Sequence, residues 1–192
     1  MVAAFLALVG LEMPTFAQTA QQVEPKPPEV FIDKGACPFE GCAYRDWTVD
    51  ADTQLYDGPG GKKLAILLKK GGRVTGLTGE VHVKPQLVRV LRDQPSVKDG
   101  KAFSFRKGEV FYLLTYLGEG EYQAWYKGEV IQVAPDFVWQ GANTCSDSPE
   151  GCWAKPEGKY QATWWVKVRL ESGAEGWSNE PDNFGNKDSL GD

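Results

Sequence analysis

The sequence predicts an all-β protein of short strands with little helix. Its 192 residues include 22 glycines and 12 prolines, a composition that favours frequent turns over long helices. In the stretch 164–177, valines alternate with Lys167 and Arg169, which is the period of a strand with one apolar face and one solvent-exposed face. Ser172-Gly173 then supplies a turn. These features predict a hairpin with an aromatic residue at each end.

The N-terminal residues predict export. Residues 2–11 form an apolar run that is too short to span a bilayer, and Thr15-Phe16-Ala17 follows as a small-x-small pattern suited to signal peptidase. We therefore expect a signal peptide at 1–17 and a periplasmic or secreted protein with no membrane span; a buried helix is the alternative. Residues 18–35 carry three prolines within four residues, which favours an extended linker or, alternatively, a proline-rich ligand segment.

Two β units are expected along the rest of the chain. The first spans 36–93, and a polar linker at 94–101 separates it from the second, which spans 102–184. Within the second unit, 134–160 has no clear period and is interpreted as an insertion. A loose tail is expected at 185–192. The strand-like segments lie at 44–49, 64–68, 87–91, 121–126 and 129–133, and the stretch 105–115 is interpreted as a turn at Lys107-Gly108 followed by a buried strand.

Three motifs resemble those of bacterial SH3-like domains. A Leu-x-x-x-Pro segment from Leu55 to Pro59 runs into a glycine-rich loop. A Lys-Gly-x-x-Val element occupies 70–74, where Gly71 and Gly72 are expected to make a turn. A Trp-x-Val segment leads through a turn to Gly-Trp at 176–177. The resemblance implies two small SH3-like β-barrels in tandem that serve as a binding or scaffolding module. It covers the first unit and the closing hairpin; the second unit has no Leu-x-x-x-Pro opening.

The four cysteines fall into two local pairs, Cys37 with Cys42 and Cys145 with Cys152. Exported proteins keep such pairs oxidised, so we favour these two disulfides among the three possible connectivities. The second bridge would pin the insertion at 134–160. A zinc site formed by all four is the alternative, although the six residues between Cys145 and Cys152 exceed the usual spacing of a zinc-binding arm.

No catalytic, metal or cofactor site is predicted. His82 is the single histidine, and we interpret it as a structural or surface residue, because a triad also needs a nucleophile and an orienting carboxylate. Glu119 with Glu121, and Glu180 with Asp182, are interpreted as solvated loop carboxylates rather than a glycosidase pair. The net charge of −5, with lysines and arginines scattered singly or in pairs, argues against nucleic acid as a partner.

Aromatic residues are the candidate ligand contacts. An outward-facing group of them would bury a large area of a peptide or sugar at small entropic cost. Trp164 and Trp165 are adjacent in a predicted strand and therefore point to opposite faces, so one of them should lean outward unless the insertion covers it. Packing of the barrel cores is the alternative role. The candidates are Trp47, Tyr56, Trp125, Trp164, Trp165 and Trp177.

Taken with the resemblance, these features predict a noncatalytic exported binding module that recognises cell-wall peptide or a protein segment through an aromatic surface. A structural or assembly component of an envelope complex is the alternative, and it would present an apolar outer patch rather than a groove. An enzyme is the third class, which the missing nucleophile, base and cofactor motifs disfavour.

Overall fold

The computed structural model describes residues 25–98, 101–134 and 152–191. Over these residues the chain is all-β, with one short 3-10 turn, η2 (Pro181–Asn183), and no α-helix. The predicted all-β class is therefore confirmed. The predicted signal peptide at 1–17 lies outside the described residues, as does most of the predicted insertion.

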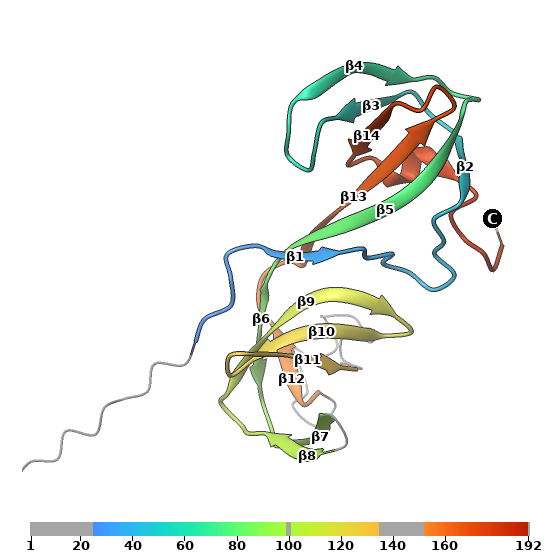
Figure 1. The fold of residues 1–192 in the computed structure, drawn as a ribbon. Coiled ribbons are helices and arrows are strands. Elements are labelled where there is room, and N and C mark those ends of the chain that lie inside the picture. The colour runs from blue at the N-terminus through green and yellow to red at the C-terminus, as the bar shows by residue number, and fades with distance from the viewer. Residues whose placement is uncertain (1–24, 99–100, 135–151, 192) are drawn as a thin grey trace, which may run out of the picture.

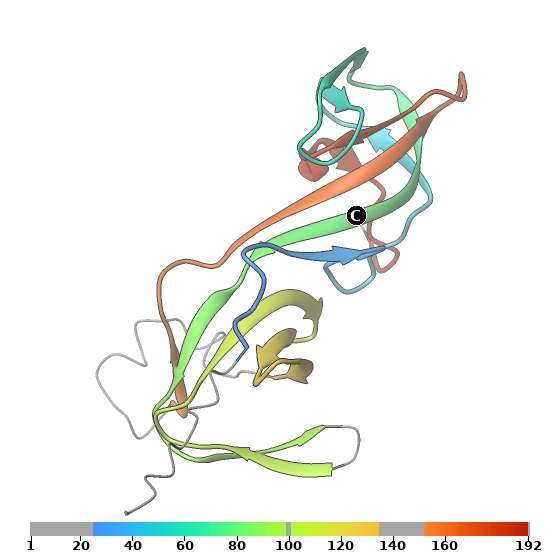
Figure 2. The same cartoon turned by 60° about the vertical axis from the view of Figure 1, so that its left-hand side comes forward.

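The strands form two lobes, one above the other in Figure 1. The upper lobe contains a large sheet with the order β15-β2-β5-β13-β14-β3-β4, in which β1 also pairs with β5. This sheet is curled like half a barrel (Figure 2). Its strands are β1 (Phe31–Lys34), β2 (Asp46–Val49), β3 (Thr53–Tyr56), β4 (Lys63–Leu68), β5 (Arg73–Lys84), β13 (Gln161–Leu170), β14 (Glu175–Ser178) and β15 (Phe184–Gly185).

The lower lobe contains a small sheet with the order β11-β10-β9-β6-β12, together with the separate hairpin β7-β8. All neighbouring strands of the small sheet are antiparallel. The strands of this lobe are β6 (Gln86–Val90), β7 (Gln94–Lys98), β8 (Lys101–Phe105), β9 (Val110–Gly118), β10 (Glu121–Tyr126), β11 (Glu129–Val133) and β12 (Ala154–Pro156).

The closing hairpin belongs to the large sheet, which corrects the predicted boundaries of the two units. Strand β13 pairs along β5, and β14 pairs with β3, so the hairpin lies with the strands of the predicted first unit and not with 102–184. Conversely, β6 was expected to end the first unit but pairs with β9 in the small sheet. The physical reason is the 12-residue length of β5, which offers one edge to β1 and β2 and the other to β13.

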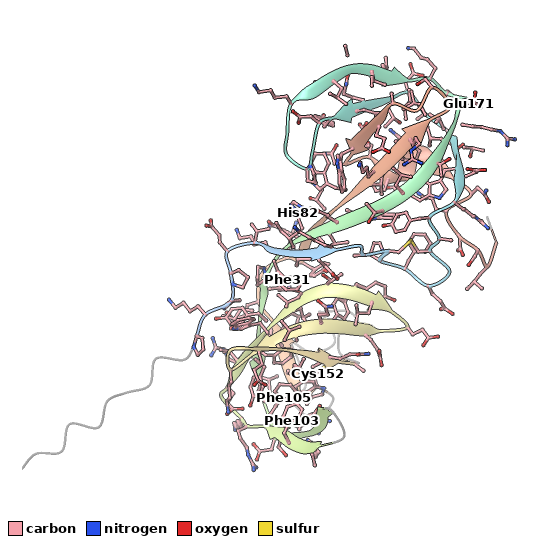
Figure 3. All side chains as sticks on the ribbon, viewed as in Figure 1. Phe31, His82, Phe103, Phe105, Cys152 and Glu171 are labelled. Carbon is pink, nitrogen blue, oxygen red and sulfur yellow. A yellow bond between two sulfur atoms is a disulfide. The ribbon has the colours of Figure 1, made fainter. Side chains whose placement is uncertain are left out.

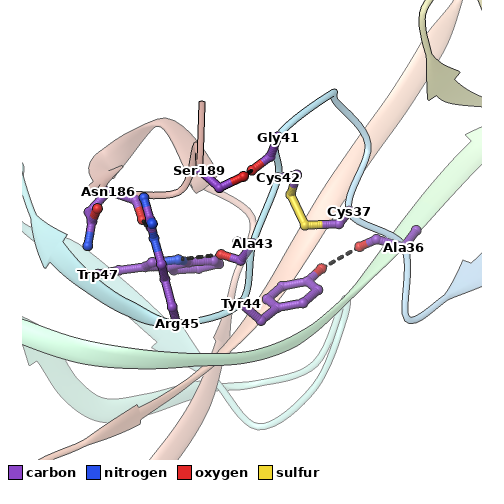
Figure 4. Close-up of a disulfide and its surroundings, with 10 residues drawn as sticks. All are labelled: Ala36, Cys37, Gly41, Cys42, Ala43, Tyr44, Arg45, Trp47, Asn186 and Ser189. Carbon is purple, nitrogen blue, oxygen red and sulfur yellow. Dashed lines mark hydrogen bonds between the residues drawn. A yellow bond between two sulfur atoms is a disulfide. The ribbon is translucent and has the colours of Figure 1, made fainter. Parts of the chain in front are cut away.

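Three segments predicted to be linker or loose chain are paired in the structure. The expected linker at 94–101 contains β7 and the first residue of β8, which pair as a hairpin. The expected linker at 18–35 contains β1, which pairs with β5. The expected loose tail at 185–192 is held to the disulfide loop, where the backbone N–H of Ser189 donates to the carbonyl of Gly41 at 2.7 Å (Figure 4). Polar and proline-rich composition therefore did not predict the backbone pairing of these segments.

Each lobe has its own aromatic core. In the large-sheet lobe, Trp47 is 1% exposed and packs against Tyr44 and Phe184, with both pairs of ring centroids 5.7 Å apart. In the small-sheet lobe, Phe105 and Trp153 stack with centroids 5.2 Å apart. The bulky rings therefore fill the two cores, the role that the sequence left open for them.

One predicted disulfide is confirmed, and one cysteine of the other lies outside the described residues. Cys37 and Cys42 are bonded, with Cα atoms 5.5 Å apart, at the entrance to the large-sheet lobe (Figure 4). Because these two cysteines are oxidised, they cannot serve as zinc thiolates, and the four-cysteine zinc alternative is wrong. Cys152 is buried, while Cys145, its predicted partner, lies outside the described residues.

Candidate functional site

The six candidate aromatic residues occupy three separate places. Trp47 and Trp164 lie on the inner face of the large sheet, where their ring centroids are 6.4 Å apart. Trp164 also meets Phe39 edge-on at 5.9 Å, so its ring packs between the disulfide loop and the core. Trp47 is almost wholly buried, and the prediction that it contacts a ligand is therefore corrected to a core role.

Three other candidates share the outer face of the large sheet. Trp177 on β14 lies directly opposite Tyr56 on β3, and Tyr56 meets Trp165 edge-on with centroids 5.5 Å apart. Trp164 and Trp165 do point to opposite faces, as expected, but Trp165 is only 8% exposed. Trp165 is therefore the buried member of this cluster, and its solvent-accessible surface belongs mainly to Tyr56 and Trp177.

Trp125 lies apart from the other five, on the small sheet. It belongs to β10, and its indole N–H donates to the carbonyl of Pro25 at 3.0 Å. Its neighbour Ala124 is buried in the core of the small-sheet lobe, so Trp125 faces away from that core. The structure thus does not bring the six aromatic residues into one surface.

A hollow of about 540 Å³ opens at one end of the large sheet, and we call it the end depression. It is lined by residues 49, 67–69, 71–73 and 170–172 and lies at the end of the sheet where Glu171 is labelled in Figure 3. Its floor is apolar, because Val49 and Leu68 are buried core residues that border it. Leu67 also lines the hollow, and 48% of the surface of this residue is exposed. A second hollow of about 500 Å³ adjoins it through Val49, Gly71 and Arg73.

The turn between β4 and β5 builds one wall of the end depression. Gly71 has a φ of +86°, a conformation that favours glycine, and its N–H donates to the carbonyl of Val49 at 2.7 Å. The N–H of Val49 in turn donates to the carbonyl of Gly72 at 3.0 Å. This reciprocal pair fixes the turn against β2 and holds the hollow in a defined shape.

Charges of both signs surround the end depression. Lys69 pairs with Asp52 at 2.7 Å, and hydrogen bonds from Lys69 and from the backbone N–H of Lys70 hold the pKa of Asp52 below its ordinary value. In the described part of the chain, the side chains of Arg73 and Glu171 make no ion pair. Arg73 and Glu171 are therefore the charges available to a ligand.

Sequence reasoning identified one wall of this hollow but not the hollow itself. The glycine pair in 70–74 predicted the turn, which the structure contains. The other wall, Leu170–Ser172, follows about a hundred residues later in the chain and reaches the first only because β13 pairs with β5. No local pattern indicates that pairing, so only the three-dimensional fold reveals the site.

The single histidine and the metal-ligating side chains of the described residues are the other places to consider. The Nε2 atom of His82 lies 3.1 Å from a carboxylate oxygen of Glu80, on the same strand, and both side chains are half-buried. Among the described residues, no group of three or more histidine, cysteine, aspartate or glutamate side chains could hold a metal ion. A search of the same residues for a helix long and apolar enough to cross a membrane finds none.

The chain matches no protein-family model, and no curated protein or solved structure is significantly similar to it. The function must therefore be argued from the geometry of the molecule.

Proposed function

We propose that this protein is a noncatalytic, exported binding module that recognises a peptide, either from the cell wall or from an envelope protein. An SH3-like character of the β units, which the motifs imply, is part of the same proposal, with one unit inserted into the other rather than following it in tandem. The observation that carries it is the end depression, a hollow with an apolar floor at which Arg73 and Glu171 make no ion pair with any described residue. Such a combination suits a peptide better than a nucleic acid or a lipid surface, which would need a uniformly basic face.

The chemistry of the hollow indicates how a peptide would be held. An apolar side chain buried against Val49 and Leu68 contributes about 1.5–3 kcal/mol. A carboxylate of the peptide accepts two hydrogen bonds from the planar guanidinium of Arg73, the arrangement in which arginine binds carboxylates best. Glu171 offers an acceptor to a backbone N–H or an amine on the opposite side. After the cost of association, we expect weak binding per site, with a Kd on the order of 0.1–1 mM.

The aromatic surface remains part of the proposal in a narrower form. Tyr56 and Trp177 lie directly opposite each other on the outer face and are both half-buried, so they offer a small platform for a peptide or sugar ring. This platform lies on the other face of the large sheet from the core residues that border the end depression. The two surfaces can therefore be tested separately.

The test is a pull-down of the mature protein with purified sacculi and with envelope extract. We expect Arg73→Glu to reduce sacculus binding at least fivefold, because it replaces the carboxylate-binding group with a repelling charge. Arg92→Glu is the matched control, since Arg92 is an exposed arginine of the small-sheet lobe and the charge change is the same. A separate variant, Tyr56→Ala with Trp177→Ala, tests the aromatic platform. Binding that survives both sets of substitutions would reject both surfaces.

The second candidate function is a structural or assembly component of an envelope complex. It is favoured by two exposed apolar residues at β1, Val30 at 49% and Ile32 at 44%. If sacculi do not bind and one protein of the extract binds in stoichiometric amount, Ile32→Ser should abolish that capture. Capture that is insensitive to Ile32→Ser would leave this candidate without support.

A further inference from the structure

A row of apolar side chains crosses the outer face of the small sheet. Leu87, Tyr112, Trp125 and Val130 lie directly opposite one another on four neighbouring strands, β6, β9, β10 and β11, and we call this row the outer stripe. Side chains paired in this way have their Cβ atoms about 4.5–5.5 Å apart, so the four form a continuous surface. Their chain neighbours Val88, Phe111, Ala124 and Ile131 are buried in the core on the other face.

The proline-rich segment of the same chain reaches the outer stripe. The indole N–H of Trp125 donates to the carbonyl of Pro25 at 3.0 Å. The ring of Pro25 lies over Gly128 in the β10-β11 turn, so closely that a Cβ atom built at that glycine would be 2.7 Å from Pro25 Cγ. In Figure 1, the chain that leads into β1 passes beside this hairpin. Two independent contacts thus place the segment at the stripe.

Proline is suited to such a surface for physical reasons. It has no backbone N–H, and a run such as Pro25-Lys26-Pro27-Pro28 favours the extended polyproline conformation, in which every carbonyl points outward unpaired. The tryptophan indole carries one donor and no acceptor, so it matches a proline carbonyl. Little conformational entropy is lost on binding, because the segment is already extended.

We infer that the outer stripe is a proline-recognition surface and that residues 25–28 of the same chain are its resident occupant. The segment continues directly into β1, where Phe31 pairs with Val83 of the large sheet. One end of the segment is therefore fixed to the large sheet and the other to the small sheet, and it latches the two lobes together. A proline-rich segment from another molecule can bind only by displacing a tethered competitor, whose effective concentration is in the millimolar range.

A pair of glycine substitutions tests the contact with a matched control. Gly128 and Gly108 both have a φ of +90° and both lie in turns of the small-sheet lobe, so alanine strains the two backbones equally. A Cβ at Gly128 strikes Pro25, whereas a Cβ at Gly108 has no atom within 4 Å. Gly128→Ala should therefore displace the latch, and Gly108→Ala should not.

The readout is the exchange rate of indole N–H groups, followed by NMR in the mature protein. We expect Gly128→Ala to speed exchange at Trp125 about fivefold or more, the factor that one hydrogen bond of ordinary net strength contributes. Gly108→Ala should leave it unchanged. The buried indole N–H of Trp47, which donates to Ala43 at 2.9 Å, should stay protected in both and serves as the control for folding. Equal effects of the two substitutions would overturn the inference.

A second variant keeps the test valid if Gly128→Ala fails to fold. Replacing Pro25, Pro27 and Pro28 together by serine alters no residue of a strand. This variant should bind a synthetic peptide of residues 21–30 and shift its Trp125 indole signal, whereas the wild type and a serine-substituted peptide should show no binding. Absence of binding to the variant would refute the inference. Protection of Trp125 that rises with protein concentration would also refute it, because the occupant would then be a second copy.

Discussion

Gly76 lies against the face of Trp47, and its replacement by alanine is expected to destabilise the large-sheet lobe. A Cβ atom at this position would be 2.7 Å from Cε2 and from Cζ2 of the indole, where ordinary contact begins at 3.4 Å. The ring of Trp47 cannot easily move away from the added methyl group. It is 1% exposed, its ring is enclosed by Tyr44, Phe184 and Trp164, and its N–H is bonded to Ala43.

The expected cost of Gly76→Ala is about 1–3 kcal/mol, the usual range for an overpacked core. Trp47→Phe removes the part of the indole that the new methyl group meets, but on its own it leaves a cavity and an unpaired carbonyl at Ala43. In the double variant the methyl group occupies part of that space. The two substitutions should therefore compensate each other, with a coupling free energy of about 1 kcal/mol or more.

Urea unfolding of the wild type, the two single variants and the double variant measures this coupling. Gly58→Ala serves as a control, because a Cβ there meets no atom within 4 Å, and it should change the free energy of unfolding by less than about 0.5 kcal/mol. Strict additivity of Gly76→Ala and Trp47→Phe, within about 0.5 kcal/mol, would show that the glycine is not needed for the tryptophan.

Two further predictions concern other contacts. Replacing Cys37 and Cys42 by serine should lower the free energy of unfolding by about 2 kcal/mol in the loop-entropy model. It should also speed hydrogen exchange at the Ser189 amide, which donates to the carbonyl of Gly41 in the disulfide loop. Unchanged exchange at Ser189 would contradict this coupling. Burial raises the pKa of Glu109, but hydrogen bonds from Lys127, Tyr126 and a backbone N–H outweigh it and hold that pKa below its ordinary value. The resulting stability is present above the unfolded carboxyl pKa of about 4.3 and is lost as pH falls through the folded value, so Glu109→Gln should destabilise the protein at neutral pH and converge with the wild type by about pH 3. A constant difference in urea midpoint across that range would be the contrary result.

Local patterns in the sequence predicted what depends on local physics. The alternation around Lys167 and Arg169 gave the long strand β13, the glycine at 71 gave a turn with positive φ, and the short spacing of Cys37 and Cys42 gave their disulfide. Each of these features is determined within a few residues, by side-chain period, backbone sterics or loop length.

Partner choice between strands could not be predicted in the same way. The hairpin of β13 and β14 is close in sequence to the small-sheet lobe, yet it pairs with β5 and β3 in the large sheet. The grouping of the aromatic candidates could not be predicted for a related reason. Alternation places Trp164 and Trp165 on opposite faces but does not reveal that Tyr56 packs on one and Phe39 on the other. Burial of a residue depends on which distant strands meet it.

The topology also explains how residues 25–28 could affect the arrangement of the two lobes. The small-sheet lobe is inserted between β5 and β13, so the chain crosses between lobes at 84–86 and returns at 157–161. The two crossings run side by side, since Lys84 pairs with Gln161 and the side chain of Gln86 donates to the carbonyl of Gly158. Pro85 at the first crossing has no N–H to extend the ladder, so pairing is interrupted at the point where the lobes join. The lobes also meet where Gly118 lies against the backbone of Glu40, and residues 25–28 form a third crossing that spans the same joint. Releasing that third crossing should alter the relative motion of the lobes while leaving both aromatic cores intact.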